Sequence, residues 1–283
     1  MPTAHKQVQV QTVLSIAGSD PSGGAGIQAD LKTFTVIGVY GGAVITSLTV
    51  QNTMGVRGIT VIAPELVKEQ ITEVLADLDV SHVKIGMVGS EATAIAIEQA
   101  LENFQGEVIY DPVTQATSGN ALAQKGASAA LVNHLASRAT VLTPNIPEMT
   151  LLIGHPVDQQ PDTEAATILF DRFPRLKALI LTGGHGPEST DTVTDHLFLR
   201  PTNNAPPTRH SQSHPRITTS NSHGTGCTFA SAFAAYHQQS SDYLKAFEQT
   251  VSFMEEIIRR SVPYQTGKGN GPLLHHLHCS GKD

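Results

Sequence analysis

The fold of this chain is decided by residues 13–34, VLSIAGSDPSGGAGIQADLKTF. The stretch opens with a continuous apolar run from Val13 to Ala17, which is typical of a buried strand. It closes with Ile27, Leu31 and Phe34, whose spacing places them on one face of a helix. A strand, a glycine-rich turn and an amphipathic helix in succession form the repeating unit of a parallel sheet covered by helices.

The same alternation continues along the chain. Further apolar runs that resemble buried strands occur at 82–85, 108–110, 140–142 and 178–181, and helical spacing recurs near 67–78 and 243–258. The pattern predicts an α/β fold, a three-layer sandwich with a mostly parallel central sheet covered by helices on both faces. The polar segment from Pro201 to Pro215 breaks this rhythm, and we expect a solvated loop there.

Composition limits the classes of function. The chain has 283 residues, 40% of them hydrophobic, and a net charge of -7, which argues against a general nucleic-acid-binding surface. Its two cysteines, Cys227 and Cys279, indicate a reducing compartment, and no segment predicts a membrane span or a leader, so we expect a cytoplasmic protein. We expect a flexible N-terminus at 1–11, a single domain at 12–278 and a tail at 279–283.

A second glycine-rich turn, His223-Gly224-Thr225-Gly226-Cys227, precedes a helix whose apolar face carries Phe229 and Phe233. The first turn of a helix has unpaired N–H groups and partial positive charge, so this segment can hold an anion such as a phosphate. In that field we expect the pKa of the Cys227 thiol to be lowered, which makes Cys227 a candidate base. A helix cap with a buried, inert cysteine is the alternative.

The turn after the first strand does not fit the common nucleotide motifs. A P-loop needs a lysine followed by Ser or Thr, whereas Gly24 and Ala25 follow Gly23. The dinucleotide fingerprint fits locally but lacks the acidic residue that should end the second strand. The turn is therefore either a ligand-binding loop or a simple tight turn. Because glycines and acids also follow the other strands, at Gly86, Asp111 and Gly183, the site is expected at the carboxyl ends of the strands.

The motifs together carry a resemblance that covers about residues 12 to 278. The chain resembles the hydroxymethylpyrimidine/phosphomethylpyrimidine kinases of thiamine biosynthesis, which belong to the ribokinase-like superfamily. The resemblance implies a homodimer that uses Mg-ATP to phosphorylate the pyrimidine alcohol and then its monophosphate. It rests on the blocks at 17–33, 50–53, 84–87, 111–113, 143–148, 183–185 and 223–227.

The resemblance also implies roles for individual residues. It implies that Gln51 and the loop at Gly18 bind the substrate, and that Asp30, Met87 and Val113 shape the pocket. Met87 also fits a plain packing role. Magnesium, usually through water, falls to Asn145 and Glu148, with Asp111 on the same face. Asn145 and Glu148 also have the spacing of a helix cap.

For phosphoryl transfer the resemblance implies a catalytic base and an anion hole. Cys227 takes the position of the base, and the amides of Gly224, Thr225, Gly226 and Cys227 form the anion hole. Thr182, Gly184 and His223 are expected at the ATP phosphates.

The chain departs from the family at three positions. Thr182 stands where many members have a phosphate-binding lysine, Thr117 replaces a lysine before Ser118-Gly119, and Thr114 replaces a methionine. A hydroxyl supplies no positive charge, so Lys268 or His185 are candidates to replace the missing cations.

Other interpretations stay open. The histidines at 275–278 suggest a zinc site, but they also fit the C-terminal signature of the family. For the whole chain, the alternatives are a pyridoxal kinase, a catalytically weakened pyrimidine-binding or regulatory protein, and a nicotinamide-dependent oxidoreductase.

Overall fold

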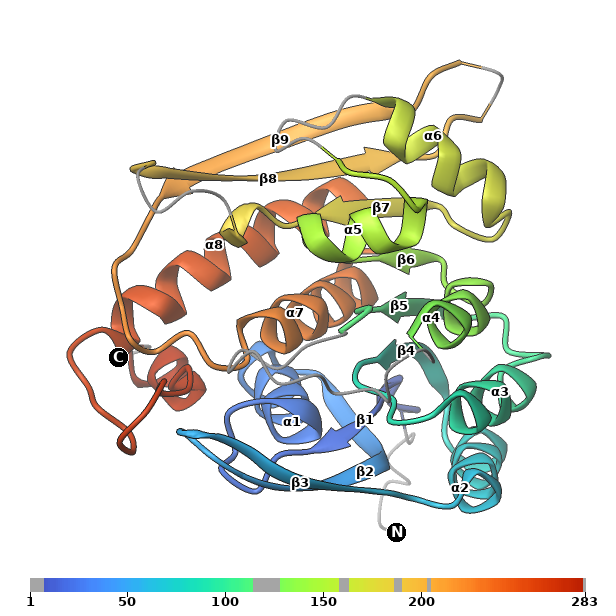
Figure 1. Ribbon diagram of the computed structural model, residues 1–283, viewed down its shortest axis with the longest axis horizontal. Helices are drawn as coiled ribbons and strands as arrows, with labels where there is room; N and C mark the ends of the chain where they lie inside the picture. Colours follow the sequence, from blue (N-terminus) through green and yellow to red (C-terminus); the bar gives the residue numbers. More distant parts are fainter. Residues whose placement is uncertain (1–7, 114–127, 158–162, 186–189, 203–204, 282–283) are drawn as a thin grey trace, which may run out of the picture.

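A computed structural model describes residues 8–113, 128–157, 163–185, 190–202 and 205–281. Its centre is a nine-stranded sheet of order β3-β2-β1-β4-β5-β6-β7-β8-β9 (Figure 1). The strands are β1 (Thr12–Ser19), β2 (Tyr40–Asn52), β3 (Gly55–Val61), β4 (Val80–Ile85), β5 (Glu107–Tyr110), β6 (Val141–Leu142), β7 (Ala178–Leu181), β8 (Thr192–Leu199) and β9 (Thr208–Pro215).

The middle of the sheet is parallel and both edges are antiparallel. β2, β1, β4, β5, β6 and β7 run in the same direction, whereas β3 pairs antiparallel with β2, and β8 and β9 add an antiparallel hairpin at the other edge. Apart from the longer β2, the parallel strands are short, and β1 and β7 are buried along almost their whole length because both of their faces are covered. The carboxyl ends of all six meet at one side of the sheet.

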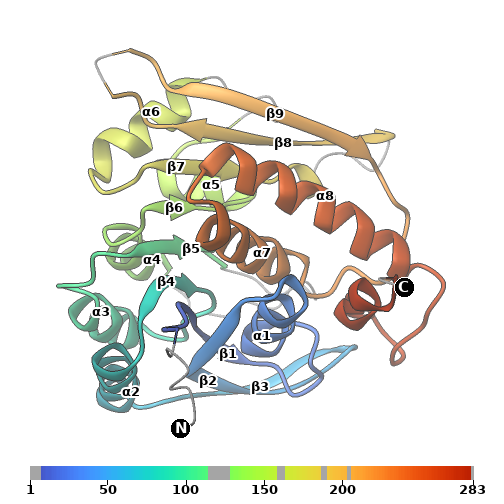
Figure 2. The same cartoon turned by 180° about the vertical axis from the view of Figure 1, so that it is seen from behind.

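Helices cover both faces of the sheet, as the sequence predicts. One face carries α1 (Gly26–Ile37), α7 (Thr225–Ser240) and α8 (Tyr243–Ser261), with a core that includes Phe34, Phe233 and Phe247 (Figure 2). The other carries α2 (Pro64–Asp77), α3 (Glu91–Ala100), α4 (Ser128–Ala136), α5 (Ile146–Ile153) and α6 (Thr163–Arg172). The expected three-layer α/β sandwich is confirmed. Two short 3-10 helices, η1 (Gly183–His185) and η2 (His275–Gly281), complete the described structure.

The expectation of a solvated loop from Pro201 to Pro215 is wrong for its second half. Residues 208–215 form β9, which pairs with β8 in register from Thr192 opposite Pro215 to Leu199 opposite Thr208. The strand is polar because it lies at the sheet edge and because one of its faces is exposed to solvent. Residues 208–215 include no run of apolar side chains, so the alternation of their two faces cannot be recognised from the sequence.

Several expectations concern residues outside the described part. Thr114, Thr117, Ser118 and Gly119 are among them, as are residues 1–7 of the expected flexible N-terminus. In the described part, no three His, Cys, Asp or Glu side chains gather in a way that could hold a metal ion. Of the histidines at 275–278, His275 instead contacts Thr228, with its Nε2 3.0 Å from the Thr228 hydroxyl. None of the helices in the described ranges has the length and apolar composition of a membrane span.

Candidate active site

The expected site residues gather at the carboxyl ends of the parallel strands, on the loops that follow the strands and on the adjoining parts of β1, β2, α1, α5 and α7 (Figure 1). The loop at 20–25 follows β1, Asp111 follows β5, Asn145 follows β6 and Thr182 follows β7. The N-terminus of α7 reaches the same side, because a side chain at Gly226 would begin 3.7 Å from Oδ2 of Asp111. The first and the last glycine-rich motifs of the chain are thereby brought together.

Asp20 organises the loop after β1. Its Oδ1 accepts hydrogen bonds from the backbone N–H and the hydroxyl of Ser22, at 2.9 and 2.7 Å. Its Oδ2 accepts from the N–H groups of Gly24 and Ala25, at 3.1 and 2.9 Å. Burial raises the pKa of this carboxyl group, but hydrogen bonds from His223 and Ser22 outweigh burial and lower the pKa to about 2. Asp20 is therefore an anion at neutral pH.

His223 joins this loop to the last motif. Its Nε2 lies 2.7 Å from Oδ2 of Asp20 and 3.2 Å from the side-chain amide of Gln51. The two glycine-rich loops pack so closely that a Cβ on Gly24 would collide with the His223 ring, and one on Gly224 would overlap the carbonyl of Gly24. The family resemblance predicts a nucleotide contact for His223, yet its side chain contacts Gln51 in the expected substrate group.

The N-terminus of α7 has the features of an anion site. Gly224, the residue before the helix, has a φ of 82°, and no side chain caps the first turn. The N–H groups of Gly226 and Cys227 have no hydrogen-bond partner among the described residues. Free amides and the helix dipole together favour a bound phosphoryl group at this position.

The protonation state of Cys227 differs from the expectation. The sequence predicts a lowered thiol pKa, but burial raises the pKa of Cys227 to about 12. The positive charge of Lys84 opposes this rise, whereas the carboxylates of Asp30 and Asp111 add to it. Although Cys227 is only half-buried, desolvation outweighs the positive charge of Lys84, and in the free protein at neutral pH the residue is a thiol.

Asp30 lies in a fully buried network rather than on a pocket wall. Both Asp30 and Lys84 are 0% exposed, and Nζ of Lys84 lies 3.0 Å from Oδ1 of Asp30. The hydroxyls of Ser15 and Ser231 donate to Asp30 at 2.6 and 2.7 Å. Burial alone would lower the pKa of Lys84. The nearby acidic groups, Asp30 above all, have the larger effect, so the pKa of Lys84 lies above its ordinary value. The carboxylate of Asp30 is saturated by protein partners, and the network fixes α7 to β1, α1 and β4.

The motifs in the sequence assign Lys84 no role of its own. A signal was present, because a lysine stands in the otherwise apolar end of a buried strand, His82-Val83-Lys84-Ile85. Charged residues are almost never fully buried without a partner, so such a lysine indicates an ion pair in the interior.

Asp111, by contrast, has an unsatisfied acceptor. Its Oδ2 is buried without a hydrogen-bond partner among the described residues, as is Oγ1 of Thr143. Burial raises the pKa of Asp111 to about 6, Lys84 opposes the rise and Asp30 adds to it. A buried acceptor that the protein leaves open is a place for a ligand group.

Asn145 and Glu148 form the helix cap that was the simpler interpretation of their spacing. Oδ1 of Asn145 accepts from the N–H of Glu148 at 2.9 Å, and Oε2 of Glu148 accepts from the N–H of Asn145 at 3.0 Å. This capping box begins α5. The backbone of Asn145 also pairs with that of Thr182 in an isolated parallel β-bridge. A residue expected to bind the metal therefore lies beside one expected to bind the nucleotide.

The remaining expected residues have the following positions. A side chain at Gly18 would begin 3.2 Å from Sδ of Met87, so Met87 packs against the first loop. Val113 donates its N–H to the carbonyl of Asp111 at 2.8 Å. The carbonyl of Gly184 accepts from the guanidinium of Arg216 at 3.4 Å. Lys268 donates its backbone N–H to the Thr53 hydroxyl, beside the turn between β2 and β3.

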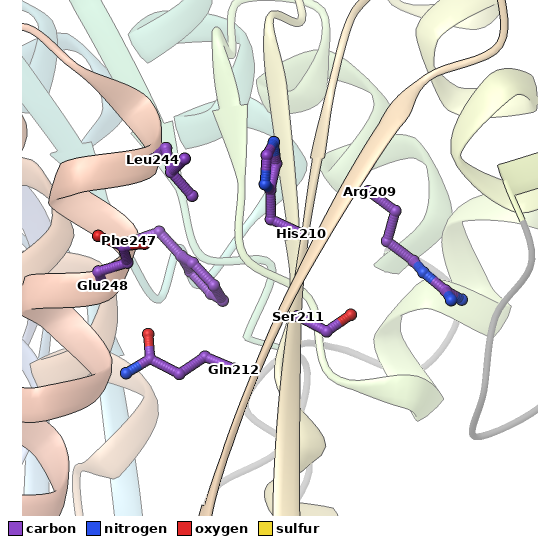
Figure 3. Close-up of a pocket in the computed structure, with 7 residues that line it drawn as sticks. All are labelled: Arg209, His210, Ser211, Gln212, Leu244, Phe247 and Glu248. Atoms are coloured by element: carbon purple, nitrogen blue, oxygen red, sulfur yellow. The ribbon is translucent and has the colours of Figure 1, made fainter.

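A pocket of about 610 Å³ lies elsewhere, between β9 and α8 (Figure 3). Figure 3 shows Leu244 and Phe247 of α8 opposite His210 and Gln212 of β9, with Arg209 pointing away. None of the seven residues that line it belongs to the expected site. We therefore do not assign the reaction to this pocket.

Comparisons with known proteins agree with these motifs. A family model described as phosphomethylpyrimidine kinase matches residues 20–274. A hydroxymethylpyrimidine/phosphomethylpyrimidine kinase from Rhizobium meliloti is 40% identical over 274 residues, which cover 95% of this chain and 98% of that protein. The pyridoxal kinase from Staphylococcus aureus, solved with pyridoxal, has a TM-score of 0.81 and 26% identity over 97% of this chain and 96% of that one. A phosphomethylpyrimidine kinase from Clostridium difficile has a TM-score of 0.71 and 30% identity, over 88% and 100%.

Proposed function

The chain belongs to the phosphomethylpyrimidine kinase family, and on that premise we propose how its site acts. The chain is a kinase that transfers the terminal phosphoryl group of ATP to 4-amino-5-hydroxymethyl-2-methylpyrimidine, and then to the monophosphate, in thiamine biosynthesis. The family match over residues 20–274 carries this conclusion. The uncapped N-terminus of α7, beside the unsatisfied carboxylate of Asp111, supports the position of the transfer.

The anion hole is formed by the amides at 224–227. Phosphoryl transfer places charge on the equatorial oxygens of the moving group, so fixed N–H donors stabilise the transition state without reorganisation. The N–H groups of Gly226 and Cys227 have no partner among the described residues, and the N–H of Thr225 makes only a long hydrogen bond of 3.4 Å to the carbonyl of Ser222. Gly224 and Gly226 have no side chains that would obstruct a phosphate. Thr182 and Gly184, on the loop after β7, are proposed to contact the remaining ATP phosphates.

Cys227 is proposed to accept the proton of the attacking hydroxyl. Because its thiol pKa is about 12 in the free protein, this role requires that bound substrates lower the thiol pKa and that the thiol proton leaves to solvent before the transfer, so that the thiolate accepts the hydroxyl proton. In a loose transition state the hydroxyl proton leaves late, so positioning matters more than a strong base. Lys84 favours the thiolate because it is the cation that opposes the rise of the thiol pKa.

A divalent metal accompanies ATP in such transfers, and Mg²⁺ fits the residues present. Mg²⁺ prefers oxygen ligands and keeps several waters. The open Oδ2 of Asp111 and the side-chain oxygens of Asn145 and Glu148 are the groups that would hold the metal and its bound water. The metal would neutralise phosphate charge, whereas the contribution of the protein is to fix these oxygens at the strand ends.

The substrate pocket is proposed to be formed by Gly18, Gln51, Met87 and Val113. Gln51 can donate and accept, which suits an aminopyrimidine edge. Asp30 acts behind the pocket, by holding Lys84 and α7, because its carboxylate has no open position.

We further propose a homodimer that works in the cytoplasm, with residues 12–278 as its single catalytic domain. Leu48 and Val50 are 46% and 65% exposed on the outer face of β2, and Met54 follows at 66%, so an apolar surface is available for a second copy. ATP and a reduced Cys227 both suit the cytoplasm. Sedimentation of the wild type and of Val50→Glu tests the dimer, since the charge should favour monomers.

Product analysis tests the function. Mass spectrometry after incubation with the pyrimidine and Mg-ATP should detect the monophosphate first and the diphosphate later, with equivalent ADP. A second candidate, pyridoxal kinase, has the likeness to the S. aureus enzyme in its favour. We expect a larger kcat/KM for the aminopyrimidine than for pyridoxal, and the opposite order would support the second candidate.

A further inference from the structure

The contact between Asp20 and His223 requires a proton. Oδ2 of Asp20 and Nε2 of His223 are 2.7 Å apart, which is a hydrogen-bond distance for two atoms that could both be acceptors. Asp20 already receives four other hydrogen bonds, two on each oxygen, and these stabilise its ionised form. The proton therefore resides on His223, and Nε2 is a donor.

A donor at Nε2 of His223 decides which way the amide of Gln51 faces. Nε2 has a single hydrogen and no free lone pair. The amide atom of Gln51 at 3.2 Å can therefore bond to it only as a second acceptor of the hydrogen that Asp20 also accepts, and that atom is the carbonyl oxygen of Gln51. The oxygen and nitrogen of a carboxamide have nearly the same shape, and a half-turn exchanges them. The donors and acceptors around the amide therefore set its orientation. A half-turn from the orientation in which Nε2 of Gln51 faces His223 places Oε1 on the His223 side.

Thr49 supports the same orientation from the other side. Its hydroxyl lies 2.9 Å from the carbonyl of Ser19 and 3.1 Å from the second amide atom of Gln51. The hydroxyl has one hydrogen, and the carbonyl of Ser19 can only accept. Thr49 therefore donates to Ser19 and accepts from Gln51, which requires the amide nitrogen of Gln51 on the Thr49 side.

We propose that Asp20, His223 and Thr49 are positioning residues that lock the Gln51 amide in one orientation and so set the substrate specificity of the pocket. The locked amide retains one free lone pair on Oε1 and one free N–H on Nε2. This pair complements a ring with an exocyclic amino group beside a ring nitrogen acceptor. It opposes a ring with an oxo group beside a ring N–H, in which donor and acceptor are exchanged. A glutamine that could turn freely would accept both.

This inference rests on the proposed function, since it assigns Gln51 to the substrate ring. It explains why the first and last motifs pack so tightly that Gly24 and Gly224 leave no space for side chains. Through this contact, His223 orients the amide of Gln51, a residue 172 positions away in the sequence that is proposed to bind the substrate ring.

The test compares the 4-amino pyrimidine with its 4-oxo counterpart. We expect wild type to prefer the amino compound in kcat/KM by more than about 100-fold, because the oxo edge leaves two polar groups unpaired. His223→Leu and Thr49→Val, which remove one side of the lock each, should reduce the preference to less than about 10-fold. His223→Gln and Thr49→Ser keep a donor and a hydroxyl, so they should retain most of it.

Two outcomes would overturn the inference. One is a wild type that uses both compounds equally, and the other is a preference that survives in both His223→Leu and Thr49→Val while the protein stays folded. Calorimetric binding of the two pyrimidines without nucleotide measures the same preference. Absence of phosphoryl transfer would therefore refute the proposed function, whereas equal binding would refute the lock.

Discussion

The same two strands, β4 and β5, carry a polar cluster at each end, and the two clusters differ in how completely they are satisfied. At the amino end, His82 of β4 lies 2.9 Å from His237 of α7, measured from Nε2 to Nδ1. Glu107 of β5 accepts from Lys177 at 2.7 Å and from Tyr243 at 3.0 Å. Among the described residues of this cluster, only Nε2 of His237 has no partner.

At the carboxyl end, several polar groups remain open. Oδ2 of Asp111 and Oγ1 of Thr143 have no partner within the described ranges, and neither do the N–H groups of Gly226 and Cys227 in the first turn of α7. Burying such groups costs free energy that the protein does not recover by itself. The comparison teaches that the closed cluster stabilises the fold, whereas the open cluster is arranged for ligands.

Cys227→Ala should separate activity from stability most strongly. Loss of a proton acceptor typically reduces the rate by about 10²- to 10⁴-fold, and we expect this in kcat, with little change in the KM of the pyrimidine. The free energy of unfolding should stay within about 1 kcal/mol of wild type. Cys227→Ser is the matched control, with partial activity. A kcat for Cys227→Ala equal to that of wild type would remove the base assignment.

Lys84→Met should lower the stability of the fold as well as the activity, because Lys84 is fully buried in an ion pair with Asp30 beside the open cluster. Removing one partner of a buried ion pair leaves Asp30 as an unpaired charge and costs about 3–5 kcal/mol. Denaturant unfolding measures this loss. The double variant Asp30→Asn with Lys84→Met leaves no unpaired charge and should recover most of the stability. If the single and double variants unfold alike, the ion pair does not hold α7.

Acidification should weaken the amino-end cluster. Burial lowers the pKa of His82 to about 4, and His237 adds to this effect. On acidification, His82 therefore binds a proton near pH 6.5 in the unfolded chain but only near pH 4 in the folded chain. Stability should fall by roughly 3 kcal/mol as the pH drops through this window, and should be constant above it as far as His82 is concerned. His82→Asn should flatten the profile of unfolding free energy against pH, and an unchanged slope would contradict the assignment.

Gln51→Ala should give the smallest effect. Loss of one hydrogen-bonding side chain costs about 1–2 kcal/mol of binding, so the KM of the pyrimidine should rise about tenfold while kcat and the KM of ATP change little. Steady-state kinetics with each substrate varied in turn separates these terms. A change in the KM of ATP alone would place Gln51 in the nucleotide site.

Local patterns in the sequence predicted the layers of the fold but not its polar edge. The run from Val13 to Ala17 and the helix face at Ile27 and Phe34 follow from hydrophobic periodicity, which is a local property. β9 did not follow from it, because an edge strand with one solvated face needs few apolar residues. Its pairing with β8 is set by tertiary contacts.

The motifs indicated where the site lies but not its charges. Cys227 was expected to have a lowered pKa because the sequence reveals a helix N-terminus and does not reveal burial. The pairing of Asp20 with His223 joins residues that are 203 positions apart, so no local pattern could predict it. Lys84 was visible as a charge in an apolar strand, but its partner Asp30 was not.

The backbone amides of Gly226 and Cys227 test the central claim most directly. Their ¹H–¹⁵N resonances should shift when a non-hydrolysable ATP analogue, the pyrimidine and Mg²⁺ are added together, because phosphate oxygens then accept their hydrogen bonds. The resonances of His82 and Glu107, at the other end of the same strands, should remain in place. Unshifted resonances for Gly226 and Cys227 in the saturated complex would contradict the assignment of phosphoryl transfer to the N-terminus of α7.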